Sequence, residues 1–251
     1  MITGISFTTT TPKPPPIATA YSCNKTSSCG CGKSDVALIS SRIVGGEDAI
    51  EDSWPMIVSV RFNGTKSHSC AGTIVSKSYV LTAAHCIRRV PFELWTNTTV
   101  AAGMTNRTDP LQIIHRVDGI YLHPNYTSIP GDNRHDIALM HIDQPFTFEF
   151  DSKVTRTCVH RIDPPVPTNQ HPKNGTRLSV IGWGTIRHGD SSLPEILQQA
   201  EVFAIDNKEP SCVNSINDTE LQFCAGLLDG GKGLYLINLL SIIFNHTFLI
   251  F

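Results

Sequence analysis

The sequence predicts an all-β domain that folds as a barrel or a sandwich. Short segments rich in β-branched and aromatic residues recur between residue 43 and about residue 233, and glycine and proline punctuate the intervals between them. Long helical periodicity is largely absent from this part of the chain. Many short strands with such interruptions favour a barrel or a sandwich over a helical architecture.

The expected strands are identified by their apolar patterning. Met56 to Phe62 alternates between the two sides of a strand, and Asn63-Gly64 directly after it is a hairpin-turn signal. Further short strands are expected at 73–75, 79–81, 178–181 and 201–205. Leu193 to Ala200 is the exception, because its spacing predicts one or two turns of helix.

Residues 1–42 and 234–251 differ in composition from the domain between them. The leader, residues 1–42, combines a threonine run with Pro-Lys-Pro-Pro-Pro, which predicts an extended stalk or spacer. The tail, residues 234–251, is hydrophobic and carries no formal charge. As a helix, the length of the tail falls just short of the bilayer's hydrocarbon thickness. Lys232 is the one basic residue that flanks it. The tail therefore predicts at most a weak membrane anchor.

Charge and composition exclude two broad classes of protein. The chain has 40% hydrophobic and 17% charged residues, a mixture that excludes wholesale disorder. Its net charge of −2 does not suit a surface that binds phosphates, so we expect no nucleic-acid partner.

Cysteines and glycosylation triplets both indicate an exported protein. The 8 cysteines, an even number scattered along the chain, fit disulfides formed in an oxidising compartment. An excess of Asn-x-Thr triplets predicts a secreted glycoprotein. These triplets begin at Asn24, Asn63, Asn97, Asn106, Asn125, Asn174, Asn217 and Asn245. No signal peptide is recognisable in residues 1–10, so we expect the true N-terminus to lie upstream.

Several short motifs occur in a characteristic order along residues 42–226. Taken alone, His85 would most often be a structural histidine and Asp136 a turn or cap residue. The motifs are Arg42-Ile43-Val44-Gly45-Gly46, Thr82-Ala83-Ala84-His85-Cys86, His123-Pro124-Asn125-Tyr126, Asp136-Ile137-Ala138-Leu139, Gly182-Trp183-Gly184 and Phe223-Cys224-Ala225-Gly226. In this combination and order, residues 43–233 resemble the trypsin/chymotrypsin family of serine proteases.

The resemblance implies two antiparallel six-stranded β-barrels with an active site between them, and an endopeptidase that acts on proteins or peptides without a cofactor. His85 matches the family's general base, which accepts a proton from a serine hydroxyl, and Asp136 matches the acid that orients the imidazole. Arg42-Ile43 matches the zymogen cleavage site, which requires an activating protease. In the family, the freed ammonium of Ile43 pairs with a buried aspartate and orders the substrate pocket.

The resemblance also implies a set of disulfides. Cys70 matches a partner of Cys86 beside the catalytic histidine, and Cys212 matches a partner of Cys224. Cys158 corresponds to a position that ties the leader to the enzyme, so its partner is expected to be one of Cys23, Cys29 and Cys31. A zinc site at Cys29-Gly-Cys31 is the competing interpretation, but no second ligand pair has suitable spacing, so no metal is expected.

The family pattern breaks after Gly233. The family continues with a segment of the type Gly-Asp-Ser-Gly-Gly-Pro, and the nucleophile falls at the position of Leu239. Ser241 lies between Leu240 and Ile242 and does not match, because no adjacent glycine provides a tight turn. The sequence therefore predicts that the serine nucleophile and the oxyanion hole are absent, and that the second barrel lacks its closing strands.

Three interpretations of the whole chain follow. In the first, the gene encodes a trypsin-like endopeptidase and the printed sequence departs from its product after Gly233. In the second, the chain is a non-catalytic homologue that acts as a secreted binding protein. In the third, the tail anchors the chain to a membrane. We rank the three in this order, and in each the chain as printed is expected to be inactive as a peptidase.

Overall fold

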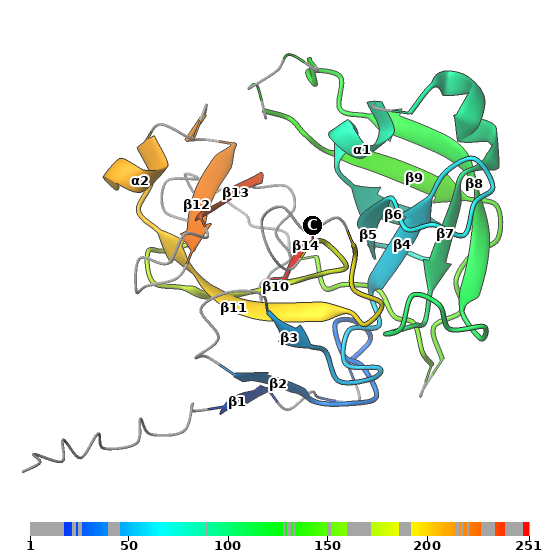
Figure 1. Ribbon diagram of the computed structural model, residues 1–251, viewed down its shortest axis with the longest axis horizontal. Coiled ribbons are helices and arrows are strands. Elements are labelled where there is room, and N and C mark those ends of the chain that lie inside the picture. The colour runs from blue at the N-terminus through cyan, green and yellow to red at the C-terminus, as the bar shows by residue number, and fades with distance from the viewer. Residues whose placement is uncertain are drawn as a thin grey trace, which may run out of the picture.

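The computed structural model contains a closed β-barrel, a second β-sheet and a leader hairpin (Figure 1). Side chains are described for residues 24, 27–37, 46–88, 90–127, 129, 132, 134–149, 152–159, 172–185, 192–210, 212, 213, 216, 218, 219 and 221–226. For residues 18–21, 38, 39, 211, 234–238 and 248–250 the structure describes the backbone alone.

The first barrel closes through antiparallel strands, which confirms the all-β prediction. Around the barrel these strands are β4 (Ile57–Arg61), β5 (Cys70–Ile74), β6 (Tyr79–Thr82), β9 (Ala138–Ile142), β8 (Ile113–Leu122) and β7 (Thr99–Ala102). Aliphatic side chains such as Val60, Ile74 and Met140 fill the interior and are fully buried. Each contributes about 1.5–3 kcal/mol by leaving water. The barrel thus gives a firm support to the residues at its rim.

The second sheet is built around a long antiparallel pair. β10 (Arg177–Gly182) and β11 (Gln198–Ile205) pair from Arg177↔Phe203 to Gly182↔Gln198. β12 (Gln222–Gly226) extends the sheet beside one end of β11, and β3 (Glu47–Asp48) pairs with the other end. A small core of Leu178, Val202 and Phe223 lies against this sheet.

The tail contributes two strands to the second sheet. β13 (Leu234–Asn238) runs antiparallel to β12, and β14 (Phe248–Ile250) runs parallel to β10. Within the described residues no ladder joins β13 to β14, so the sheet is open between them. Whether the second barrel lacks closing strands stays a prediction. The described part of the chain contains no helix with the length and apolar character that a membrane span needs.

A shared apolar cluster joins the barrel, the second sheet and the leader. We call it the seam cluster, and its members are Val36, Ala49, Trp54, Met56, Ile57, Ala71, Ala101, Met104, Ile181, Trp183 and Leu197. Trp183 is fully buried there, and its Nε1–H donates to the carbonyl of Thr105, 3.2 Å away. Because this cluster draws on both β-structures, it fixes one against the other.

The prediction of helix at Leu193 to Ala200 is wrong. Ile196 instead forms an isolated bridge with Asn106, and β11 begins at Gln198. Arg107 explains the difference, because its guanidinium donates to the carbonyls of Leu193 and Pro194 and its backbone N–H donates to that of Glu195. These contacts take the carbonyls that a helix would use for its own hydrogen bonds.

Part of the leader packs against the domain, contrary to the prediction of an extended stalk. β1 (Ala18–Tyr21) and β2 (Val36–Ile39) form an antiparallel pair, and Val36 is buried in the seam cluster. The side chain of Gln199 donates to the carbonyl of Ala37 at 2.7 Å. A Cβ on Gly32 would lie 2.0 Å from the carbonyl oxygen of Asp52, so only glycine permits this close approach. The threonine run and the prolines lie outside the described residues.

Candidate active site

Strand register in the first barrel brings His85 and Asp136 together. β6 ends at Thr82, which pairs with Ala138 at the start of β9. Helix α1 (Ala84–Arg88) follows β6 and carries His85, whereas Asp136 lies just before β9. The ladder therefore places both side chains at the same end of the barrel, although 51 positions separate them in the sequence.

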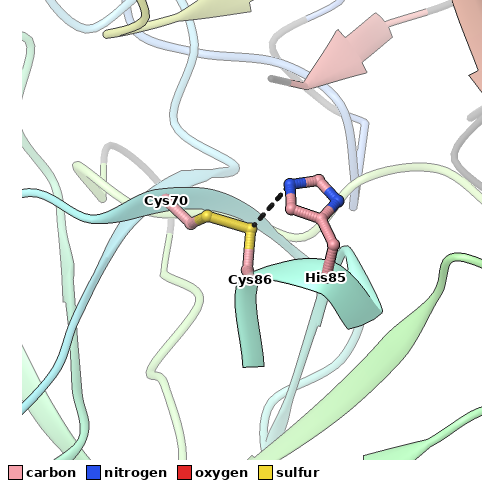
Figure 2. A group of neighbouring side chains, drawn as sticks. All are labelled: Cys70, His85 and Cys86. Carbon is pink, nitrogen blue, oxygen red and sulfur yellow. Dashed lines mark hydrogen bonds between the residues drawn. A yellow bond between two sulfur atoms is a disulfide. The ribbon is translucent and has the colours of Figure 1, made fainter. Parts of the chain in front are cut away.

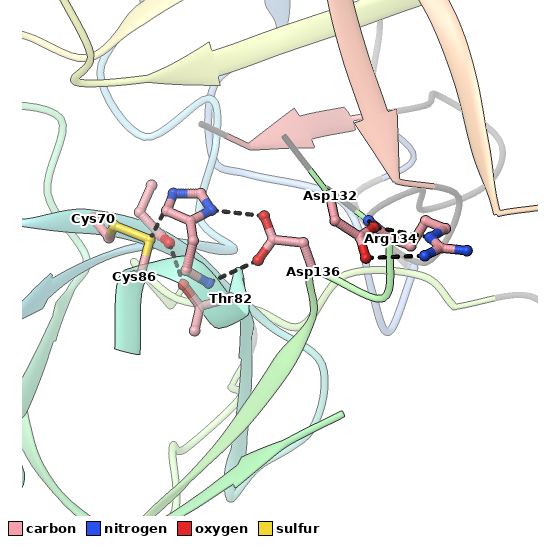
Figure 3. A network of polar contacts seen from close by, with 8 residues as sticks. Cys70, Thr82, Cys86, Asp132, Arg134 and Asp136 are labelled. Carbon is pink, nitrogen blue, oxygen red and sulfur yellow. Dashed lines mark hydrogen bonds and ion pairs between the residues drawn. A yellow bond between two sulfur atoms is a disulfide. The ribbon is translucent and has the colours of Figure 1, made fainter. Parts of the chain in front are cut away.

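Asp136 holds His85 through both of its carboxylate oxygens (Figure 3). Its Oδ1 accepts a hydrogen bond from the backbone N–H of His85 at 2.7 Å. Its Oδ2 lies 2.7 Å from Nδ1 of the imidazole. The side chain of Asp136 is 12% exposed and that of His85 is 42% exposed. The carboxylate is thus largely shielded from water, while the imidazole faces solvent.

This geometry assigns a separate role to each imidazole nitrogen. An ionised carboxylate can only accept a hydrogen bond, so Nδ1–H donates to Asp136. In the neutral ring, Nε2 then carries a lone pair and can accept a proton from a nearby hydroxyl. The arrangement is therefore suited to general-base catalysis.

The loop before Asp136 is braced by an exposed ion pair. The guanidinium of Arg134 donates to Asp132 at 2.8 Å (Figure 3). Thr127 Oγ1 also donates to Asp132, at 3.0 Å. These hydrogen bonds hold the pKa of Asp132 well below its ordinary value, and the carboxylate in turn raises the pKa of Arg134. His135 has a φ of 56°, and its ring stacks on that of His123 with centroids 4.6 Å apart.

Comparison with known proteins identifies the family. The profile of the family described as Trypsin matches residues 43–234, which is most of the chain. The chain belongs to the trypsin family. In solved structures, it is similar to neuropsin, a serine protease expressed in the limbic system of mouse brain. That alignment has a TM-score of 0.62 at 25% identity and covers 79% of this chain and 84% of neuropsin.

Curated relatives include two larger trypsin-family proteins. The chain is 32% identical over 203 residues to transmembrane protease serine 11C of Mus musculus, covering 80% of this chain and 43% of the relative. It is also 32% identical over 203 residues to transmembrane protease serine 7 of Homo sapiens, covering 80% of this chain and 22% of that relative. The chain thus spans less than half of the length of either relative.

Three disulfides join described residues of this trypsin-family chain. They are Cys29–Cys158, Cys70–Cys86 and Cys212–Cys224. Among the leader cysteines, Cys29 is therefore the one bonded to Cys158, and the backbone N–H of Gly30 donates to the carbonyl of Arg156 beside this bridge. Cys31 is also disulfide-bonded, whereas Cys23 lies outside the described residues.

One group of side chains in the described residues has the spacing of a metal site, namely Cys70, His85 and Cys86 (Figure 2). Their ligand atoms lie within 4.8 Å of one another. The two sulfurs are bonded to each other, however, and a disulfide offers no thiolate to a metal ion. In its oxidised form this group is therefore not a metal centre.

Several predicted site residues lie outside the described residues. They are Arg42 and Ile43 of the cleavage site, Leu239 at the nucleophile position, and Ser241. Among the glycosylation candidates, Asn24, Asn63, Asn97, Asn125 and Asn174 are exposed and Asn106 is half-buried. Asn217 and Asn245 are not among the described residues.

Sequence reasoning missed a basic group, Arg61, His68 and Arg107, that contacts the seam cluster through Met104 and Trp183. Arg61 is 1% exposed, and its guanidinium donates to Gln112 Oε1 at 2.7 Å and to the carbonyl of Arg107 at 3.1 Å. Burial and the charge of Arg107 lower the pKa of Arg61. Burial, followed by the charges of Arg107 and Arg61, lowers the pKa of His68 to about 4. An arginine inside a short strand carries no sequence signal that distinguishes it from a solvent-facing one.

Proposed function

We propose that this chain carries the acid–base half of a trypsin-like serine endopeptidase site, with His85 as general base and Asp136 as its orienting acid. The carrying observation is the pair of contacts from Asp136, one to Nδ1 and one to the backbone N–H of His85, each 2.7 Å long. Together they fix the position and the tautomer of the imidazole. The substrates would be proteins or peptides.

The proposal includes activation by proteolysis in an oxidising, extracytoplasmic compartment. An activating protease would cut between Arg42 and Ile43, and the Cys29–Cys158 disulfide would keep the leader attached to the domain. The disulfides and the exposed glycosylation triplets support secretion, because both modifications are made along the export route. Residues 43–233 would constitute the peptidase domain.

We further propose that the chain itself does not hydrolyse peptides. Leucine occupies the position where the family has its serine, and a leucine side chain has no hydroxyl to deprotonate. The oxyanion hole of the family is formed by backbone N–H groups of the same missing segment. Without both groups, the dyad of His85 and Asp136 has neither a nucleophile nor a stabilised transition state.

A second candidate function is that of a non-catalytic homologue that binds other proteins. One observation favours it: β13 and β14, which follow the break in the family pattern, both pair with strands of the second sheet. A non-catalytic homologue must still fold, and a tail that pairs with the sheet would be part of such a fold.

Reconstruction of the site tests the proposed peptidase function. We define the reconstituted chain as residues 1–233 joined to the C-terminal segment of a trypsin-family peptidase that contains Gly-Asp-Ser-Gly-Gly-Pro. After cleavage at Arg42, it should hydrolyse fluorogenic peptides, and a fluorophosphonate should label its new serine, because His85 then faces a nucleophile. A matched chain with alanine in place of that serine controls for contaminants. A folded reconstituted chain that shows neither turnover nor labelling would contradict the proposal.

A further inference from the structure

The second imidazole nitrogen of His85 faces a disulfide sulfur (Figure 2). Nε2 lies 3.5 Å from Sγ of Cys86, which is bonded to Cys70. Cys70 is the first residue of β5, and Cys86 follows His85 in α1. The bridge therefore ties the helix that carries His85 to the barrel wall. Cys86 is 7% exposed, whereas Cys70 is half-buried, so an incoming molecule reaches Cys70 more easily.

A hydrogen bond from Nε2 of His85 to the disulfide requires a proton on Nε2. A disulfide sulfur bears no proton, and Nδ1–H already donates to Asp136. Nε2 can therefore donate to Cys86 only from the imidazolium form, in which both ring nitrogens carry protons. The carboxylate of Asp136 compensates that positive charge. An imidazolium beside a cysteine stabilises the thiolate and lowers the pKa of the thiol.

We propose that Cys70–Cys86 is a thiol–disulfide exchange site whose substrate is a small thiol, with Cys86 as the leaving sulfur and His85 as its proton donor. Exchange is faster when the departing thiol has a lower pKa. Of the two sulfurs, Cys86 is the one in contact with an imidazole nitrogen, and Cys70 is the more accessible to attack.

The exchange balances with two molecules of thiol. A first thiolate attacks Cys70 Sγ, the disulfide bond breaks, and its electron pair leaves on Cys86 Sγ, which takes a proton from Nε2 of His85 or remains paired with the imidazolium. A second thiolate attacks the outer sulfur of the mixed disulfide and releases Cys70. The protein disulfide is reduced by two electrons, and the two small thiols are oxidised to their disulfide.

Exchange at this site would also affect the nitrogen that the proposed peptidase needs. After reduction, the thiolate of Cys86 competes for Nε2 of His85, and α1 is no longer bonded to β5. The chemistry of the exchange itself does not depend on the proposed peptidase function, because it requires no serine.

Reduced glutathione supplies the test, on the intact chain. Samples are quenched over time, free thiols are alkylated, and peptide mass spectrometry gives the reduction rate of each disulfide. The internal reference is Cys212–Cys224, which joins α2 (Pro210–Val213) to β12 in the same molecule. In His85→Gln, reduction of Cys70–Cys86 relative to this reference should slow about tenfold, because the leaving thiolate of Cys86 loses its imidazolium partner.

Two further readouts separate proton donation from simple shielding. His85→Ala removes a side chain that lies 3.5 Å from Cys86 Sγ, so shielding alone predicts faster reduction, whereas the proposal predicts slower reduction. The first glutathione adduct should form on Cys70 and not on Cys86. An unchanged relative rate in His85→Gln, faster reduction in His85→Ala, or a first adduct on Cys86 would each overturn the proposal. An unchanged rate at Cys212–Cys224 shows that the variants remain folded.

Discussion

His85→Ala should lower kcat of the reconstituted chain by about 10⁶-fold, the effect expected when the general base of a serine triad is removed. In the proposed mechanism Nε2 of His85 takes the serine proton, and Asp136, which lies against Nδ1 on the other side of the ring, cannot replace it. Steady-state hydrolysis of a fluorogenic peptide, measured beside the parent reconstituted chain, provides the comparison.

The same assay distinguishes the orienting carboxylate from the base. Asp136→Asn should lower kcat by about 10⁴-fold, because an amide in place of the carboxylate permits the wrong imidazole tautomer. His141 and Asp118 provide the matched control, since they form a second histidine–aspartate contact on the exposed side of the barrel. His141→Ala should leave kcat within about twofold of the parent value. Equal losses in His141→Ala and His85→Ala would contradict the assignment.

Trp183→Ala should lower the free energy of unfolding by about 4 kcal/mol, the usual cost of truncating a buried aromatic side chain. Trp183 is fully buried in the seam cluster, and its loss would open a cavity between the barrel and the second sheet. The hydrogen bond from its Nε1–H to Thr105 would be lost as well. Urea unfolding followed by far-ultraviolet circular dichroism measures the change.

A surface substitution provides the control for the seam. Leu111 is 74% exposed, so Leu111→Ala should change the free energy of unfolding by no more than about 0.5 kcal/mol. If Trp183→Ala were as mild as Leu111→Ala, the seam cluster would not be what holds the two β-structures together.

The strands were predictable where local pattern and tertiary contacts agree. Met56 to Phe62 alternates and contains β4, and 178–181 lies within β10. Asn63 and Gly64 have φ values of 56° and 64°, the two positive angles that the predicted tight turn requires. In these segments the residues carry their own conformational preference.

Long-range contacts explain where prediction failed. Leu193 to Ala200 has helical spacing, but Arg107 from the first barrel binds its backbone carbonyls. The leader hairpin is held by Gln199 and by the seam cluster. These contacts come from residues far from 36–39 in the sequence, so the local pattern does not indicate them. The tail lacks strand alternation, and its two strands depend on ladders to β12 and β10.

The candidate site was predictable in identity and not in geometry. Motifs singled out His85 and Asp136, but only the Thr82↔Ala138 register explains how they meet. The stacked rings of His123 and His135 and the contact between His85 and Cys86 had no sequence signal, because each depends on side-chain orientation.

We propose that the chain holds a general base, His85, without a serine nucleophile. The most direct test of this claim is peptide hydrolysis by the purified chain, cleaved after Arg42, beside the His85→Ala variant prepared in the same way. Both should give the same background rate over a broad panel of peptide substrates, because leucine stands at the sequence position where the family has its serine. Turnover by the cleaved chain that disappears in His85→Ala would contradict the claim.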